Sequence, residues 1–333
     1  MKISFIIPTY NGLRLLQRCL SSLVSQVDNE DEIIIIDDGS TDGTYDYLIN
    51  TYSKNNNVVV LHQSNGGQGK ARNLGIETHR KGYIWFIDSD DTIVDGAVKK
   101  IKCELSKKDY DLLFFDYYII KENNVKIPMD LNINVEDKKS LYLSHHYPVN
   151  KIIHSGLLED VRFPETKIKY EDHATIPKII SMASNVGYLK EYLYVYDFSH
   201  SNNSSKNAKT ENDIYRICDI LIDFFHEKNM IRNADLLIVK PLLFGKILTI
   251  PKLELSLREK YKEYFIVKQY LDKNIPRWRI SILFNKIYDK TALKSVENYR
   301  VKDLVAKSFA FSPFFTTCVL LVAVKALRGK NKS

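Results

Sequence analysis

Cysteine is scarce in this chain of 333 residues, and its four positions are scattered at Cys19, Cys103, Cys218 and Cys318. Because no two of them have the spacing of a paired metal-ligand motif, the sequence indicates neither a zinc site nor a disulfide framework. A secretory signal is also lacking, since residues 3–7 form only a short apolar run before Pro8. We therefore expect reduced thiols and a cytoplasmic location.

Long apolar runs are lacking too. The seventeen residues between Lys307 and Lys325 carry no charge, but a bilayer span needs about twenty apolar residues. Pro313 and two threonines weaken the segment further. The composition favours a helix that lies in the plane of a membrane, and a core helix packed on the rest of the protein is the alternative.

The positive charge is unevenly distributed. The net charge is +7, and residues 277–333 contain twelve Lys or Arg against three Asp or Glu, which leaves the remainder slightly negative. A basic end on a nearly neutral body indicates an anionic partner, either a membrane or a nucleic acid. Near an anionic lipid surface each such residue contributes on the order of 1 kcal/mol. We expect the cytoplasmic membrane surface to be this partner, and no nucleic acid.

The first 120 residues alternate strand-like apolar runs with segments of helical periodicity. This βαβ pattern predicts an α/β fold with a mainly parallel, doubly wound sheet. Helices are expected at residues 13–24, from about residue 40 to 52, after Gly69 and from Asp95. The expected strands are 3–7, 32–36, 58–61, 83–87 and 112–118.

The pattern changes in the second half of the chain. Polar residues 123–134 predict a loop or hairpin, and helices are expected at 138–146 and 174–182. From about residue 211 the chain is predicted to be wholly helical, because apolar residues recur there at helical spacing. The first such stripe is Ile214, Ile217, Cys218, Leu221, Ile222 and Phe225.

A boundary between two regions is predicted near residue 205. Residues 199–209 are polar and rich in Ser and Asn, a composition typical of a loop or linker. The sequence therefore predicts an N-terminal domain at 1–205 and a helical, basic C-terminal region at 206–333. The end of that region, about 277–333, is the candidate for membrane association.

Two acidic turns follow strands that are predicted to be buried. Asp88-Ser89-Asp90-Asp91 comes directly after residues 83–87, and Asp37-Asp38-Gly39-Ser40 directly after residues 32–36. Adjacent carboxylates repel each other unless a cation offsets their charge, and hard divalent ions prefer oxygen ligands. Open α/β sheets bind ligands at the carboxyl ends of their strands. The turns therefore predict one shared cleft for a metal-assisted reaction on a charged substrate.

Residues near these acidic turns are of types that can bind a nucleoside diphosphate. Asp38 can accept a hydrogen bond from a base, Tyr10 can stack on its ring, and Thr9 can reach its polar edge. Helix capping is the alternative for Thr9 and Asp38. The glycine-rich residues 65–69 allow the backbone to approach a ligand closely, and Arg72 near a helix N-terminus can face a phosphate. A solvated helix charge is the alternative for Arg72.

The sequence contains four strings that, in this order and spacing, resemble the family 2 inverting glycosyltransferases of the GT-A fold. These strings are IIPTYNG, IIIIDDGSTDGT, NGGQGKARNLG and FIDSDD. The resemblance covers residues 3–95 strongly and continues more loosely to Tyr196. It implies a Rossmann-like GT-A fold with a helical, basic C-terminal extension, and an enzyme of bacterial cell-surface or capsular polysaccharide synthesis.

The resemblance also implies roles for particular residues. Thr9, Tyr10 and Asp38 would contact the uracil and ribose of a nucleotide sugar, and Arg72 its diphosphate. A Mn²⁺ or Mg²⁺ ion would be held by Asp90, the expected direct ligand, and by Asp88. The complete expected donor site is Pro8, Thr9, Tyr10, Asp38, Gly67, Arg72, Asp88 and Ser89.

The acidic pair Glu171-Asp172 matches the position of the family's catalytic carboxylates. By resemblance Asp172 is the base that takes the proton of the acceptor hydroxyl, and Glu171 supports it. Helix capping is the alternative for Asp172, because the helix at 174–182 is expected to begin just after it. His173 would tune this carboxylate or face solvent, and His200 is a further candidate near the diphosphate.

These observations together predict a metal-dependent inverting glycosyltransferase that acts at the inner face of the cell membrane. It would move a sugar from a nucleotide sugar, expected to be a UDP-sugar, to a hydroxyl of a saccharide or lipid-linked saccharide. A sugar nucleotidyltransferase is one alternative, but it would need a glycine-rich basic loop where this chain has Pro8-Thr9-Tyr10-Asn11-Gly12. A non-catalytic membrane- or nucleic-acid-binding module is the other alternative, because the basic end is compatible with it.

Overall fold

The structure, a computed structural model, describes residues 1–80, 82–121, 125–199, 213–230, 255–275 and 277–279, a few positions between 235 and 250, and residues 309–310. The chain divides into two compact units, Met1–Asn207 and Ala208–Ser333. The boundary predicted at residue 205 lies in the segment 200–212, outside the described residues.

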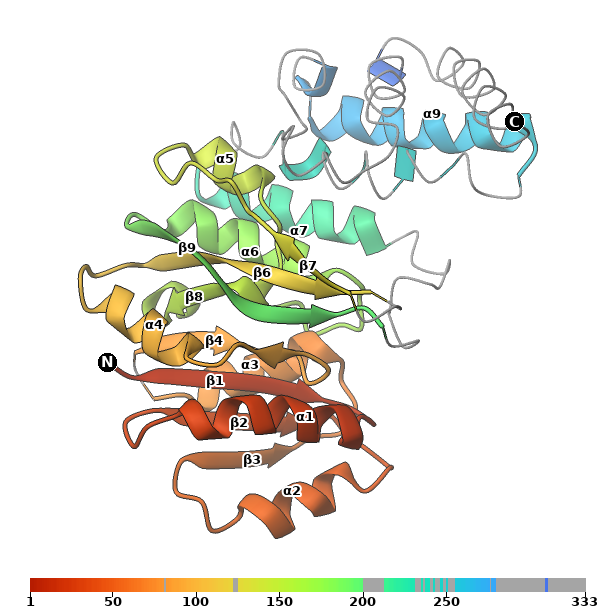
Figure 1. Ribbon diagram of the computed structural model, residues 1–333. Coiled ribbons are helices and arrows are strands. Elements are labelled where there is room, and N and C mark those ends of the chain that lie inside the picture. Colours follow the sequence, from red (N-terminus) through yellow and green to blue (C-terminus); the bar gives the residue numbers. More distant parts are fainter. Residues whose placement is uncertain are drawn as a thin grey trace, which may run out of the picture. The chain divides into compact units, whose positions relative to one another are not determined.

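The first unit is built on one sheet. The order of its strands is β3-β2-β1-β4-β8-β6-β9-β5, and β7 pairs with β6 (Figure 1). Figure 1 shows β3 at the lower edge of this sheet and β6 and β9 at the upper end. The strands are β1 (Ile3–Thr9), β2 (Glu32–Asp37), β3 (Val58–His62), β4 (Tyr83–Phe86), β5 (Thr92–Ile93), β6 (Leu112–Ile120), β7 (Lys126–Met129), β8 (Lys151–His154) and β9 (Val186–Asp197).

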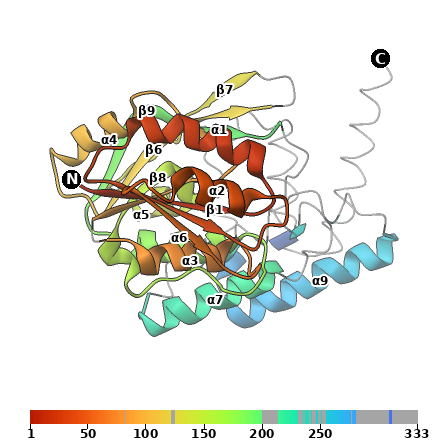
Figure 2. The same ribbon diagram turned by 90° about the horizontal axis from the view of Figure 1, so that it is seen from below.

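Helices cover both faces of the sheet. Figure 1 and Figure 2 together show α1 and α4 on one face and α3 and α6 on the other. Every residue of β1 and β2 is buried as a result, which explains their nearly continuous apolar sequences. The helices of this unit are α1 (Leu13–Leu23), α2 (Thr44–Tyr52), α3 (Gln68–Thr78), α4 (Ala97–Leu105), α5 (Lys138–Leu143) and α6 (Glu171–Met182).

The parallel half of the sheet confirms the predicted pattern. β1 pairs in parallel with β2 and β4, and β2 pairs in parallel with β3. The other half is mixed, because β8 lies antiparallel between β4 and β6, while β9 runs parallel to β6. All five predicted strands are present, and the polar segment after β6 forms the hairpin strand β7.

The core of this unit centres on Trp85, whose side chain is fully buried. Its ring packs at centroid distances of 5.7 Å on Phe5 and 5.3 Å on Phe115, so it joins β1, β4 and β6. The indole nitrogen donates a hydrogen bond of 2.8 Å to the carbonyl of Val149. The buried polar group is therefore satisfied, as a packed core requires.

Several helix boundaries differ from the predictions. α2 begins at Thr44, later than predicted, because Gly39 and Gly43 adopt left-handed φ values of 78° and 84° and extend the turn after β2. α6 begins at Glu171, three residues earlier than predicted, after Tyr170 in a left-handed conformation. α4 begins at Ala97 rather than at residue 95, and α5 ends at Leu143 rather than at residue 146.

The described part of the second unit is helical. α7 (Asp213–Glu227) buries the whole predicted apolar stripe, from Ile214 to Phe225. α9 (Leu257–Asn274) begins with a capping box in which Ser256 and Glu259 bind each other's backbone nitrogens. No helix of the described part of the chain is both long and apolar enough to cross a membrane. Almost all of the basic segment 277–333 lies outside that part.

Candidate active site

A cleft of about 470 Å³ opens at the carboxyl ends of β1, β2 and β4. The strands bring these ends together because they pair in parallel, with Thr9 opposite Asp37. The backbone N–H of Asp38 continues the ladder by donating to the carbonyl of Thr9 at 2.8 Å. Every predicted donor or metal residue except Arg72 lines the cleft, namely Pro8, Thr9, Tyr10, Asp38, Gly67, Asp88, Ser89 and Asp90.

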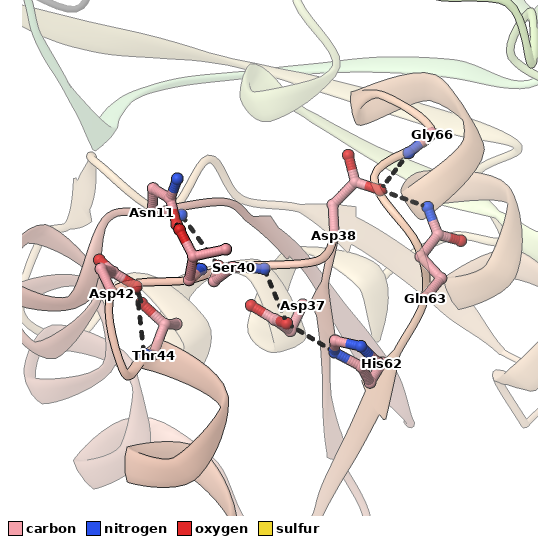
Figure 3. Close-up of polar contacts among 10 residues, drawn as sticks. Asn11, Asp37, Asp38, Ser40, Asp42, Thr44, His62, Gln63 and Gly66 are labelled. Atoms are coloured by element: carbon pink, nitrogen blue, oxygen red, sulfur yellow. Dashed lines mark hydrogen bonds and ion pairs between the residues drawn. The ribbon is translucent and has the colours of Figure 1, made fainter.

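The turn after β2 is fixed by its own polar side chains (Figure 3). Asp37 accepts hydrogen bonds from the N–H of Ser40 at 3.2 Å and pairs with His62 at 2.7 Å. The backbone N–H of Asn11, next to the cleft, donates to the hydroxyl of Ser40 at 2.9 Å. Asp42 accepts from the N–H of Thr44 and so begins α2. This turn therefore holds the ends of β1 and β2 in one arrangement.

Asp38 is buried and anchors the glycine-rich loop. One carboxylate oxygen accepts from the side chain of Gln63 and the N–H of Gly66, both at 2.7 Å, as Figure 3 shows. The other oxygen accepts from the N–H of Gly67 at 2.8 Å. Asp38 thus does not cap α2, the helix that follows its own strand. Its contact with a base stays a prediction, compatible with its place in the cleft wall.

Thr9 and Tyr10 differ sharply in exposure. The hydroxyl of Thr9 is buried and has no hydrogen-bond partner among the described residues, and it does not cap α1, whose N-cap is Gly12. A buried hydroxyl without a partner costs free energy, so a ligand group that bonds to it would recover that cost. Tyr10 is 51% exposed beside it, which leaves its ring available for stacking on a base.

The acidic turn contains carboxylates in two different environments. Asp88 accepts from Arg72 at 2.8 Å and from Gln68 at 2.9 Å, and Asp90 is exposed in the cleft. Asp91 is buried and instead binds the hydroxyl of Tyr194 at 2.7 Å. Burial, together with the charges of Asp90 and Asp88, raises the pKa of Asp91 well above its usual value. The side chains of Asp88 and Asp90 therefore line the cleft, whereas the side chain of Asp91 is buried in the protein interior.

Arg72 connects this turn to the predicted catalytic pair. Its guanidinium is almost fully buried, donates to Asp88 at 2.8 Å and to Glu171 at 2.5 Å, and lies 5.2 Å from the ring centre of Phe163. The alternative, a solvated helix charge, is therefore wrong. Its predicted contact with a diphosphate remains a prediction, because both carboxylates already engage the guanidinium in this structure.

Glu171 and Asp172 occupy the first turn of α6. Burial raises the pKa of Asp172 to about 6, although the charge of Arg72 opposes this shift, and burial also raises the pKa of Glu171. A carboxylate with a pKa near neutrality is suited to accept a proton. Asp172 does not occupy the N-cap position, which belongs to Tyr170; its carboxylate accepts from the N–H of His173 at 2.8 Å.

The two histidines singled out in the sequence have different outcomes. His173 faces His146, with ring centres 5.0 Å apart and the two Nδ1 atoms 3.1 Å apart, so it does not simply face solvent. His200 lies outside the described residues.

Two residues at the site were missed by sequence reasoning. Tyr196, near the end of β9, lines the cleft, and Gln68 at the start of α3 holds Asp88. Gln68 belongs to the string NGGQGKARNLG, and Tyr196 ends the segment of looser resemblance. Nothing in the sequence distinguished them from ordinary helix and strand residues, because their roles depend on contacts with distant segments.

Comparisons with known proteins agree with this architecture. Residues 4–166 match the model of the family described as "Glycosyl transferase family 2". The chain is 28% identical over 243 residues to the glycosyltransferase GlyG of Streptococcus pneumoniae, a match that covers 68% of this chain and 79% of GlyG. It is 47% identical over 102 residues to the poly(ribitol-phosphate) beta-glucosyltransferase of Bacillus spizizenii, covering 29% of this chain and 16% of that protein.

A solved structure has a similar fold. The crystal structure of S. aureus TarS 1-349 in complex with UDP-GlcNAc superposes with a TM-score of 0.69 at 21% identity, and covers 93% of this chain and 91% of that one. This likeness confirms the expected fold, and the matched family model confirms the expected enzyme class. Residues 4–166 therefore form a family 2 glycosyltransferase domain, and the chain has the GT-A fold.

Proposed function

We propose that this protein transfers a sugar from a UDP-sugar to a hydroxyl group of a saccharide or lipid-linked saccharide, with inversion at the anomeric carbon, in the synthesis of a surface polysaccharide. The observation that carries the proposal is the link that Arg72 makes between Asp88 in the donor cleft and Glu171 beside Asp172. Two relatives support the substrate class: TarS was crystallised with UDP-GlcNAc, and the Bacillus spizizenii protein is a poly(ribitol-phosphate) beta-glucosyltransferase.

Asp172 supplies the base for this reaction. Its carboxylate takes the proton of the acceptor hydroxyl while that oxygen forms a bond to the anomeric carbon. The bond between that carbon and the diphosphate oxygen breaks on the opposite face, and its electron pair leaves with UDP. Arg72 holds the neighbouring Glu171 at 2.5 Å and thereby fixes the start of α6 beside the reacting groups.

A Mn²⁺ or Mg²⁺ ion fits the donor end of the cleft as part of the proposal. In the described part of the chain no three His, Cys, Asp or Glu residues are grouped to hold an ion by themselves. Asp88 and Asp90 nevertheless line the same cleft, and Mg²⁺ is commonly held by one or two carboxylates together with substrate phosphates. When bound, the ion would offset the charge of the departing diphosphate.

Turnover of nucleotide sugars tests the proposal. Purified protein is incubated with separate UDP-, GDP- and dTDP-sugars and a mixture of saccharide acceptors, with Mn²⁺ or with a chelator, and the released nucleotide is measured. We expect release of UDP only with Mn²⁺ or Mg²⁺, and loss of that release in Asp90→Ala. Release of a different nucleotide, or equal turnover with chelator, would contradict the donor or the metal assignment respectively.

The proposal includes a cytoplasmic location, at the inner face of the cell membrane. The net positive charge of residues 277–333 supports this placement, because anionic lipid attracts such segments. A lipid-linked acceptor would be reached most readily by an enzyme held at that surface.

A further inference from the structure

A chain of polar contacts joins α1 and the end of β9 to the acidic turn from outside the cleft. Arg18 on α1 forms an ion pair of 2.7 Å with the carboxylate of Asp197, the last residue of β9. The same guanidinium donates a hydrogen bond of 2.5 Å to the backbone carbonyl of Asp90. Arg18 therefore connects three segments that are far apart in sequence.

Asp91 closes this chain of contacts. One of its carboxylate oxygens accepts from the N–H of Asp197 at 2.8 Å, and the other accepts from the hydroxyl of Tyr194 at 2.7 Å. The hydroxyl of Tyr194 in turn accepts from the N–H of Asp88 at 3.1 Å. The backbone of the acidic turn is thus held at Asp88 by β9 and at Asp90 by α1.

The contact at Asp90 is made with the backbone carbonyl. Arg18 consequently orients the peptide that carries Asp90, whose side chain lines the cleft. Tyr196 lies on β9 between Tyr194 and Asp197 and lines the same cleft. The strand end that holds the turn therefore also contributes to the wall of the cleft that the donor residues of β1 line.

We propose that Arg18 is a positioning residue for the donor site. By binding the Asp90 carbonyl and the Asp197 carboxylate together, it fixes the two cleft carboxylates, Asp88 and Asp90, in the arrangement that receives a diphosphate with its cation. The inference rests on the proposed metal-dependent use of UDP-sugars. It assigns to Arg18 no contact with substrate and no step of the reaction.

Binding of UDP to the intact protein tests the proposal, measured by calorimetry with and without Mn²⁺. Partners outside the coordination shell typically change metal affinity or activity by about 10–100-fold. We therefore expect Arg18→Ala to weaken UDP binding by at least about tenfold when Mn²⁺ is present, and by much less when it is absent. Arg18→Lys keeps a charge for Asp197 but loses the paired geometry, so its effect should be intermediate.

Arg14→Ala is the matched control. Arg14 is exposed on the same helix one turn earlier, and its removal changes the net charge by the same amount. We expect this variant to bind UDP as the unaltered protein does. An equal loss in Arg14→Ala, or an Arg18→Ala loss that is the same with and without Mn²⁺, would overturn the positioning role.

Amide hydrogen exchange of residues 88–91 provides a readout that needs neither metal nor turnover. Removal of Arg18 should speed exchange in this segment while leaving the core strand β1 protected. Unchanged exchange in Arg18→Ala would refute the inference even if binding fell. Faster exchange, in a protein that shows no metal dependence of UDP binding, would refute the proposed metal-dependent function and confine Arg18 to a structural role.

Discussion

At the scale of single residues, burial and the charge of Arg72 influence the protonation of the predicted catalytic pair, Glu171 and Asp172. Asp172 and Glu171 both have raised pKa values because burial disfavours their charged forms, and Arg72 limits the rise. The identity of these carboxylates followed from the family resemblance. Their raised pKa values could not be predicted from the sequence. They depend on Arg72, whose carboxylate partners Asp88 and Glu171 lie 16 and 99 residues away in the chain.

The first prediction concerns the pH dependence of the base. Asp172 accepts a proton only when it is deprotonated, so kcat/KM should rise with pH and level off above about 6. Asp172→Asn should lower kcat by about 10²–10⁴-fold and abolish the rise of kcat/KM with pH, which is the acidic limb of the profile. UDP binding should be retained, which a binding measurement on the same variant checks. Full turnover in Asp172→Asn would rule out the assigned base.

The second prediction concerns the charge of Arg72. Because this guanidinium lowers the pKa of Asp172, Arg72→Gln should move the acidic limb of the kcat/KM profile to higher pH. Arg80→Gln removes the same charge from an exposed side chain that pairs with Glu32, and it should leave the limb in place. An acidic limb that stayed in place or moved to lower pH in Arg72→Gln would contradict the assigned effect of the Arg72 charge on the pKa of Asp172.

At the scale of elements, the strands β1 to β4 and β6 were predictable, and several helix starts were not. The apolar runs of β1, β2 and β4 identified a parallel sheet, and its register placed the cleft. The late start of α2 depends on left-handed glycines and on the bonds of Asp37 and Asp42. The insertion of β8 between β4 and β6 was not predictable, because a short strand of four residues carries no information about its partner.

The third prediction concerns the packing of α3 on the sheet. A Cβ atom added at Gly75 would collide with the side chains of Ile6 on β1 and Ile36 on β2. Gly75→Ala should therefore lower the free energy of unfolding by about 1–3 kcal/mol, as overpacked cores do. In Gly12→Ala the new Cβ would lie 3.8 Å from its nearest neighbour, an ordinary contact, so the loss should be smaller. Denaturant unfolding of both variants measures the difference, and equal stabilities would contradict it.

At the scale of the whole molecule, the N-terminal unit was the more predictable part. Its fold rests on periodic patterns, and the cleft residues follow from strand ends that the sequence already located. The sequence of the C-terminal unit predicted helices but no catalytic or binding residues. The spacing of its apolar residues identified only the buried stripe of α7. A membrane role for residues 277–333 rests on composition alone.

The fourth prediction concerns that basic end. Replacing Lys325, Arg328, Lys330 and Lys332 by Gln in the full chain should weaken binding to phosphatidylglycerol vesicles by more than about tenfold, because each charge contributes about 1 kcal/mol. Binding to uncharged phosphatidylcholine vesicles should change little.

The control removes as much charge from the first unit, at exposed positions. Lys54, Lys99, Lys108 and Lys121 are replaced by Gln together. Vesicle cosedimentation should show no loss for this variant. Equal losses in both variants would indicate attraction by overall charge and not by the C-terminal segment.

The buried guanidinium of Arg72 has a consequence for the whole reaction cycle. Asp88, which lines the donor cleft, and Glu171, beside the proposed base, share this counter-charge. Any gain or loss of charge at Asp88 must alter the field felt at Glu171 and Asp172, and the reverse holds equally. In the proposed reaction, donor loading and acceptor activation would therefore be electrically linked through Arg72, without a conformational change.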